Sequence, residues 1–178
     1  MNLRIVEIQK DSWIMDGVPE PYCEIFREEP WKEELEPKEV IETMREQLER
    51  PGAIALAAIK DKKVVGFIWM YEIFKSDLKE GTRYSPKLKF LFENQKRVLY
   101  LQEMGVIKEM RQQGIGEKLA RELLRRGKQN GAKVVVLSTN GKAKSMISLI
   151  SKIGFQNSGI VRPPKELGRT YWVFELMD

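Results

Sequence analysis

Two glycines in a short polar loop mark the stretch of this chain whose residue types and spacing could do chemistry. Residues 111–117 read Arg-Gln-Gln-Gly-Ile-Gly-Glu, after an apolar run at 98–107 that predicts a strand and within the start of an amphipathic pattern at 114–130 that predicts a helix. The first N–H groups of a helix lack intrahelical acceptors, and glycine lets the backbone approach phosphate oxygens closely. The pattern therefore predicts an anion site, and phosphates suggest a nucleotide-containing cofactor.

Two widespread phosphate motifs do not fit this loop. The chain contains no Gly-x-x-x-x-Gly-Lys-Ser/Thr sequence, and Leu119 stands where a Gly-x-Gly-x-x-Gly motif needs its third glycine. The loop therefore predicts neither a P-loop nor a Rossmann dinucleotide site.

The chain has no histidine and one cysteine, Cys23. This composition excludes Ser-His-Asp and Cys-His catalysis and the common zinc sites, so no metal is expected. A single cysteine cannot form an internal disulfide, and without a base to activate it we expect Cys23 to be inert packing. Acid–base chemistry must then use Glu, Asp, Tyr, Lys or water.

Predicted strands and helices alternate on both sides of the loop. The runs at 54–59 and 64–74 flank a polar turn and predict a hairpin, whereas the strand–helix–strand unit over 98–137 predicts parallel strands joined by a right-handed crossover. Further strands are expected at 3–8, 155–161 and 171–176, and further helices between 36 and 51 and at 142–152. The fold class is therefore α/β, with a mixed, mostly antiparallel sheet of six to seven strands flanked by helices.

Three short segments resemble the GCN5-related N-acetyltransferases, the GNAT family. Residues 111–116 match the family's Gln/Arg-x-x-Gly-x-Gly/Ala signature, Met104-Gly105-Val106 is similar to its cofactor strand, and Ile153-Gly154-Phe155 is similar to the Gly-Phe after its last helix. Glycine at position 105 also leaves room for close approach of a ligand.

The resemblance implies one acetyltransferase-like domain over 1–178. Residues 1–97 would form the acceptor side and the N-terminal sheet, 98–155 the acyl-CoA-binding core, and 156–178 the C-terminal strands. It also implies a sheet that splays between the strand 98–107 and the strand 133–138, with the cofactor in the opening.

The implied cofactor is acetyl-CoA or another acyl-CoA. Backbone groups on the strand would bind its pantetheine, and the loop amides would bind its pyrophosphate. For two of the residues, Asn140 and Lys144, the alternative is ordinary chemistry of a helix start. The expected cofactor-binding residues are Met104, Gly105, Val106, Ile107, Arg111, Gln112, Gln113, Gly114, Ile115, Gly116, Glu117, Asn140 and Lys144.

The implied reaction is direct transfer of an acetyl group to a primary amine. Glu103, on the strand just before the cofactor segment, is the predicted base, because family members often carry an acidic residue there. Glu72 and Tyr100 compete for this role, and Glu103 could instead be an ion-paired glutamate.

One departure from the family concerns the general acid. Many members carry a tyrosine four residues before the glycine of Gly-Phe, where this chain has Ile150. Ser148 or Ser151 could instead steer a water molecule. Trp31 and Tyr71 are the aromatic residues expected to line the acceptor site, and the acceptor itself is left open between small-molecule and protein amines.

The sequence also limits the location that we expect. No apolar run reaches the ~18 residues of a membrane span, and no signal-peptide pattern begins the sequence, so a cytoplasmic location is expected. The net charge of +5 is spread over a mixed surface without a basic arm, so nucleic acid is not an expected partner. An exposed last strand could pair two copies of the chain.

Two alternatives to the acetyltransferase function stay open. They are a non-catalytic acyl-CoA-binding module of the same fold and a basic nucleic-acid-binding protein.

Overall fold

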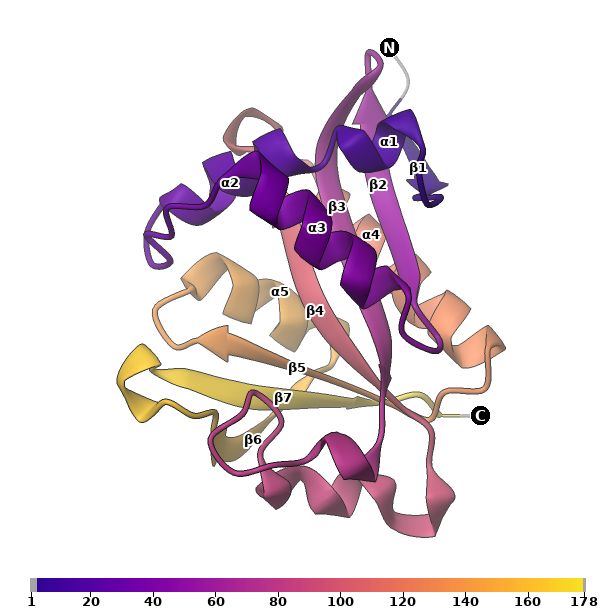
Figure 1. Ribbon diagram of the computed structural model, residues 1–178, viewed down its shortest axis with the longest axis vertical. Helices are drawn as coiled ribbons and strands as arrows, with labels where there is room; N and C mark the ends of the chain where they lie inside the picture. Colours follow the sequence, from indigo (N-terminus) through magenta and orange to yellow (C-terminus); the bar gives the residue numbers. More distant parts are fainter. Residues whose placement is uncertain (1–2, 178) are drawn as a thin grey trace. The chain divides into compact units, whose positions relative to one another are not determined.

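The computed structural model describes residues 3–177, in which seven strands form one mixed sheet in the order β1-β2-β3-β4-β5-β7-β6. Helices flank the strands, as Figure 1 shows. The predicted α/β fold class is therefore confirmed. In chain order the elements are β1 (Arg4–Glu7), α1 (Trp13–Asp16), α2 (Pro19–Arg27), α3 (Pro37–Leu48), β2 (Ile54–Lys60), β3 (Lys63–Ile73), β4 (Val98–Val106), α4 (Ile115–Gln129), β5 (Val134–Asn140), α5 (Lys144–Ile153), β6 (Gln156–Val161) and β7 (Arg169–Glu175).

Short 3-10 helices occupy several connections. They lie at Lys75–Asp77, Pro86–Gln95, Lys108–Met110 and Lys165–Leu167. The connection between β3 and β4 contains two of them. Within residues 3–177, no helix combines the length and the apolar character needed to cross a bilayer.

Contacts divide the chain into two compact units, each made of two segments. The first unit contains Met1–Tyr71 and Leu101–Arg126, and the second contains Glu72–Tyr100 and Gly127–Asp178. The three functional segments that the resemblance implies are each continuous in the sequence, so their bounds differ from those of these units. The roles of the three segments stay a prediction.

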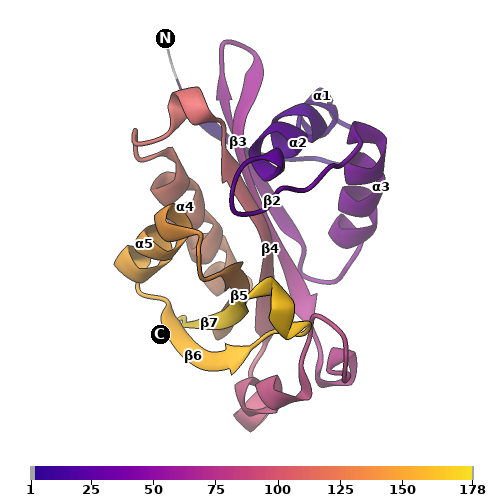
Figure 2. The ribbon, with the colours of Figure 1, turned by 90° about the vertical axis from the view of Figure 1, so that its left-hand side faces the viewer.

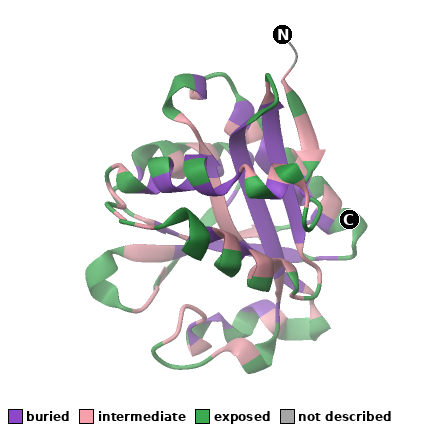
Figure 3. Ribbon diagram, turned by 45° about the horizontal axis from the view of Figure 1, so that its top comes forward, coloured by how far each residue is buried: buried purple, intermediate pink, exposed green. Residues whose placement is uncertain are grey.

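The first unit is built on the antiparallel strands β1, β2 and β3. β1 pairs with β2 from Arg4 opposite Ile59 onward, and the predicted hairpin of β2 and β3 is confirmed. Asp61 and Lys62 both have positive φ, the geometry of the tight turns whose twist matches that of paired strands. β2 and β3 are almost continuously buried, and they are the purple strands of Figure 3.

Helices cover β3 on both faces, because successive side chains on a strand point in opposite directions. Phe67 faces α2, where its ring centroid lies 5.5 Å from that of Tyr22. The neighbouring residue, Gly66, faces α4, where a Cβ atom would lie 3.3 Å from Leu119 Cδ1. Figure 2 accordingly shows α4 on the opposite side of β2 and β3 from α1, α2 and α3.

The predicted apolar stripe of α4 is buried as expected. It consists of Ile115, Leu119, Leu123 and Leu124, none more than 6% exposed. The buried stripe fixes the rotation of α4 about its own axis. It therefore also sets the direction in which the amides of the first turn point.

Gly105 on β4 is required by packing. A Cβ atom at this position would lie 2.8 Å from both Ile25 Cδ1 and Phe67 Cζ, closer than real carbon contacts. The space that the sequence suggested would admit a ligand is therefore filled by side chains of α2 and β3.

The second unit carries the expected parallel pair. Val98 lies opposite Val134 and Tyr100 opposite Val136, so β4 and β5 run in the same direction. β7 then pairs with β5 over seven residue pairs and with β6 on its other side. The expectation of an exposed last strand is therefore wrong, because β7 is interior and β6 forms the edge.

The Gly-Phe pair after α5 closes that helix. Gly154 has φ 117°, and the N–H groups of Gly154 and Phe155 both donate to the carbonyl of Ile150. Such a left-handed C-cap supplies donors to carbonyls at the end of the helix that have no donor within the helix. The Phe155 ring then packs against Phe174, with centroids 5.2 Å apart.

Tyr171 ties the connection before β4 to β7. Its buried hydroxyl donates to the Arg83 carbonyl and accepts from the Ser85 N–H. Burial raises the pKa of Tyr171 to about 12.

We predict that Gly105→Ala destabilises the protein by about 1–3 kcal/mol, because the added methyl must displace Ile25 or Phe67. Chemical denaturation measures the change. Gly141→Ala is the matched control, since its Cβ would meet only the Gly168 carbonyl at 3.8 Å. Equal stability of the two variants would contradict the packing role of Gly105.

We predict that Tyr171→Phe lowers stability by about 1–3 kcal/mol near neutral pH, because it leaves a buried N–H and carbonyl without partners. The folded pKa of about 12 lies above the usual value of 10. The hydroxyl therefore stabilises fully below about pH 10, and this contribution is lost as the pH rises towards 12. Denaturation at several pH values should show the difference between wild type and variant shrinking over this range; a constant difference would contradict the assignment.

Candidate functional site

The loop between β4 and α4 bends through two left-handed residues. Gln112 has φ 59° and Gly114 has φ 74°, and the Gly114 carbonyl accepts the first bond of the helix, 3.0 Å from the Lys118 nitrogen. Gln112, Gln113 and Gly114 are exposed. The predicted strand, loop and helix are thus present with the loop open to solvent.

A run of backbone N–H groups in this loop has no acceptor within residues 3–177. Its members are the amides of Gln112, Gln113, Gly114, Ile115 and Gly116. Donors at a helix N-terminus, next to the positive end of the helix dipole, suit an anion. The loop thus meets the physical requirement that the sequence predicted for phosphate binding.

Arg111 does not direct its charge into this run. Its guanidinium makes two hydrogen bonds to the Glu28 carboxylate, at 2.7 and 3.0 Å, and its Nε–H donates to the Val106 carbonyl at 2.9 Å. The hydrogen bonds from Arg111 hold the pKa of Glu28 below its usual value. Arg111 therefore joins the end of α2 to the end of β4, and its charge is balanced within the protein.

Hydrogen bonds through Gln102 link the side chains of Tyr71 and Glu103, which are both predicted site residues. The Tyr71 hydroxyl donates to Gln102 Oε1 at 2.6 Å, and Gln102 Nε2 donates to Glu103 Oε1 at 3.0 Å. The Arg50 guanidinium lies over the Tyr71 ring, 4.9 Å from its centroid. Sequence reasoning missed Gln102, for which only its place beside Glu103 gave a signal.

The other residues considered for catalysis or for lining the acceptor site are engaged or buried. Glu72 accepts a hydrogen bond from Arg97 at 2.9 Å, and the Tyr100 hydroxyl lies 2.9 Å from Ser138 Oγ. Ile150 is 1% exposed, so its position on α5 faces the core. Trp31 packs against Phe26, with ring centroids 5.8 Å apart.

Asn140 and Lys144 lie at the end of β5 and the start of α5. Asn140 Oδ1 accepts from the Lys142 N–H at 2.8 Å, and its Nδ2 donates to the Leu167 carbonyl at 2.9 Å. The amide of Asn140 thus holds the turn that follows β5. Lys144 is exposed at the first residue of the helix.

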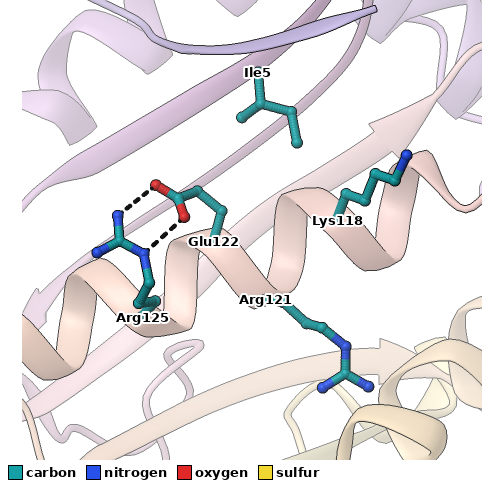
Figure 4. Close-up of a pocket in the computed structure, with 5 residues that line it drawn as sticks. All are labelled: Ile5, Lys118, Arg121, Glu122 and Arg125. Atoms are coloured by element: carbon teal, nitrogen blue, oxygen red, sulfur yellow. Dashed lines mark hydrogen bonds and ion pairs between the residues drawn. The ribbon is translucent and has the colours of Figure 1, made fainter.

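A hollow of about 420 Å³ beside α4 does not contain the expected chemistry. It is lined by Ile5, Lys118, Arg121, Glu122 and Arg125. Figure 4 shows Glu122 bound by Arg125, while Arg121 points away from Ile5. Hydrogen bonds from Arg125 and Arg126 lower the pKa of Glu122 to about 2, too low for a general base.

Several solved structures share this fold. An N-acetyltransferase from Staphylococcus aureus Mu50 matches with a TM-score of 0.72 at 15% identity, over 99% of this chain and 100% of that one. A ribosomal-protein-alanine N-acetyltransferase from Brucella melitensis matches with 0.71 at 17% identity, over 98% and 100%. Arabidopsis thaliana NAA60, solved in complex with acetyl-CoA, matches with 0.68 at 14% identity, over 98% and 99%. No curated protein sequence is significantly similar to the chain.

The family model described as "Acetyltransferase (GNAT) family" matches residues 14–155. The match contains β4, the open amides of the loop and the Gly-Phe pair, which carried the resemblance in the sequence. The chain therefore belongs to the GNAT family of acetyltransferases.

Proposed function

We propose that this protein is an acetyl-CoA-dependent N-acetyltransferase that transfers the acetyl group directly to a primary amine. The observation that carries the proposal is the run of amides at 112–116 without acceptors, at the N-terminus of α4. A pyrophosphate offers several oxygens to such a run at once. Family membership and the compared acetyltransferases support acetyl-CoA as the cofactor.

The residues present suit this cofactor. The amides at 112–117 would bind its pyrophosphate, and the backbone at 104–107 would bind its pantetheine. Arg111 would position both by fixing the end of β4 to α2, since its own charge is balanced by Glu28. Lys144, exposed at the start of α5, remains a proposed phosphate contact, while Asn140 would act by holding its turn.

The bound cofactor would supply the acetyl group as a thioester. Glu103 would take the proton that the ammonium form of the acceptor must lose, directly or through water. Gln102 and Tyr71 would orient the Glu103 carboxylate through their hydrogen bonds. A backbone N–H at or near Val106 would stabilise negative charge on the reacting carbonyl oxygen. Direct transfer is favoured because Cys23 is buried and burial raises its pKa, which disfavours an acyl-cysteine.

The second candidate function is a non-catalytic acyl-CoA-binding module. Ile150 favours it, because this buried aliphatic residue cannot donate a proton where many family members place a tyrosine. Ser148 and Ser151 are exposed on α5 and could steer a water molecule instead. Release of free thiol across a panel of amines separates the two functions: turnover supports the enzyme, whereas cofactor binding without turnover supports the module.

We predict that acetyl-CoA raises the melting temperature of the wild type and that Gly114→Val weakens acetyl-CoA binding by at least ~10-fold. A β-branched residue strongly disfavours the positive φ of Gly114, so the loop amides would be reoriented. Thermal shift and calorimetry measure the effect. Gly81→Val is the matched control, because Gly81 has φ 73° and, like Gly114, no atom within 4 Å of its Cβ position. Equal acetyl-CoA binding by both variants would contradict the assignment of the loop.

We predict that Glu103→Gln lowers kcat by about 10²–10⁴-fold and changes the Kd for acetyl-CoA by less than about twofold, because only the base is removed. Initial rates and calorimetry give the two quantities. Glu109→Gln, on the exposed turn Lys108–Met110, is the control and should retain wild-type rates. Unchanged turnover in Glu103→Gln would remove Glu103 from the base role.

A further inference from the structure

One connection of the second unit carries most of the net charge of the chain. The β3–β4 connection, residues 74–97, contains seven Lys or Arg and three Asp or Glu residues, a net charge of +4, whereas the whole chain carries +5. The charge is therefore concentrated in this connection rather than spread evenly. A local excess of cations is typical of a surface that binds a polyanion.

Four exposed lysines of this connection have side chains without partners. Within residues 3–177, no ion pair or hydrogen bond engages their ammonium groups. They are Lys75, Lys79, Lys87 and Lys89. In contrast, Lys96 pairs with Glu175 at 3.5 Å. Arg97 pairs with Glu72 at 2.9 Å. The charges of the four lysines are thus available to a partner outside the chain.

Two phenylalanine rings of the β3–β4 connection are exposed beside these lysines. Phe74 and Phe90 are each 42% exposed. Phe74 directly precedes Lys75, and Phe90 directly follows Lys89. A single exposed apolar residue needs no explanation. Here, however, each exposed ring adjoins an ammonium group that has no partner, and this combination offers two kinds of contact at once.

The 3-10 helix Pro86–Gln95 fixes which of its side chains face outward. Leu88 and Leu91 are 0% and 3% exposed, so their row of the helix packs inward. Side chains three residues apart lie in one row of a 3-10 helix. Lys87 and Phe90 are both exposed and three residues apart, so they form an outward row. The ring and the ammonium group are thus presented together by a helix that is anchored through its leucines.

Hydrogen bonds hold the β3–β4 connection in shape. The Lys79 N–H donates to the Tyr84 carbonyl at 3.0 Å, which closes the loop between them. Ser85 Oγ accepts from the Lys87 N–H at 3.3 Å, and the Ser85 N–H donates to the Tyr171 hydroxyl at 3.2 Å. Both short helices of the connection lie at the lower edge of Figures 1 and 2. The lysines and the rings therefore belong to one ordered part of the second unit.

We propose that the β3–β4 connection binds single-stranded nucleic acid. Each nucleotide of a single strand offers a base that stacks on an aromatic ring and a phosphate that pairs with a cation. Lys87 and Phe90 present these two partners in one row. An acidic peptide would pair with the lysines and leave the rings without partners, and a duplex keeps its bases stacked on each other. The sequence alone did not predict this partner, because it does not show which lysines stay unpaired. The proposal does not depend on acetyl transfer.

The first experiment measures binding of a labelled single-stranded oligothymidylate by fluorescence anisotropy at several salt concentrations. Replacing the four lysines together by glutamine should weaken binding by about 10-fold or more. It should also reduce the salt dependence, because each phosphate contact contributes about 0.7 to the slope of log K against log salt concentration. The matched control replaces four exposed lysines of the first unit, and so changes the net charge equally. These are Lys38, Lys62, Lys63 and Lys118.

The control variant should bind the oligonucleotide as the wild type does. Equal weakening by the two sets of substitutions would overturn the proposal, because binding would then follow net charge alone. Absence of wild-type binding at low salt would overturn it as well. Wild-type protein that binds polyglutamate or phosphatidylserine vesicles as tightly as the oligonucleotide would also contradict a nucleic-acid site.

The second experiment tests the rings separately from the charge. Phe74→Leu and Phe90→Leu keep an apolar side chain and remove the stacking surface, so each should weaken binding by about fivefold or more. Phe90→Trp should retain binding. Unchanged affinity in both leucine variants would contradict base stacking.

The third experiment locates the site on the wild type without any substitution. The protein is saturated with CoA, because the loop amides at 112–116 also suit phosphates, and is then titrated with the oligothymidylate. We expect the largest backbone N–H shifts in NMR to fall within residues 74–97. Loss of oligonucleotide binding in the presence of CoA, or shifts confined to other segments, would overturn the proposal.

Discussion

Backbone N–H groups need acceptors, and the loop before α4 together with the first two residues of the helix leaves five consecutive ones without any in the described chain. The buried stripe from Ile115 to Leu124 holds the helix on the sheet, so this turn cannot roll inward to find partners. Left-handed residues at positions 112 and 114 bend the loop so that it stays open. The donors, the bend and the buried stripe together form a site that suits an anion. The proposed cofactor site rests on these backbone groups rather than on any single charged side chain.

Charged groups that are balanced within the protein are poor candidates for binding a ligand or for catalysis. Arg111, although part of the recognised loop motif, is bound to Glu28 and to a backbone carbonyl, and so it acts as a clamp. The same reasoning makes Glu122, saturated by two arginines, a poor candidate for catalysis.

Local patterns in the sequence were sufficient to predict most of the fold and the loop. Apolar periodicity predicted the strands and α4, the polar turn at Asp61 predicted the hairpin, and the signature at 111–116 predicted the family. Partners distant in sequence could not be predicted: Glu28 lies 83 residues from Arg111, and nothing local to Gly105 indicates that Ile25 fills the space beside it. The edge position of β6 was missed because the order of strands in a sheet is not a local property.

The central claim is that the amides at 112–116 bind the phosphates of an acyl-CoA, and backbone amide NMR tests it most directly. In a titration of the labelled protein with CoA, the account predicts that the largest saturable N–H shifts fall on Gln112, Gln113, Gly114, Ile115 and Gly116, since each gains an acceptor. Unchanged amide resonances at these five residues in the presence of saturating CoA would contradict it.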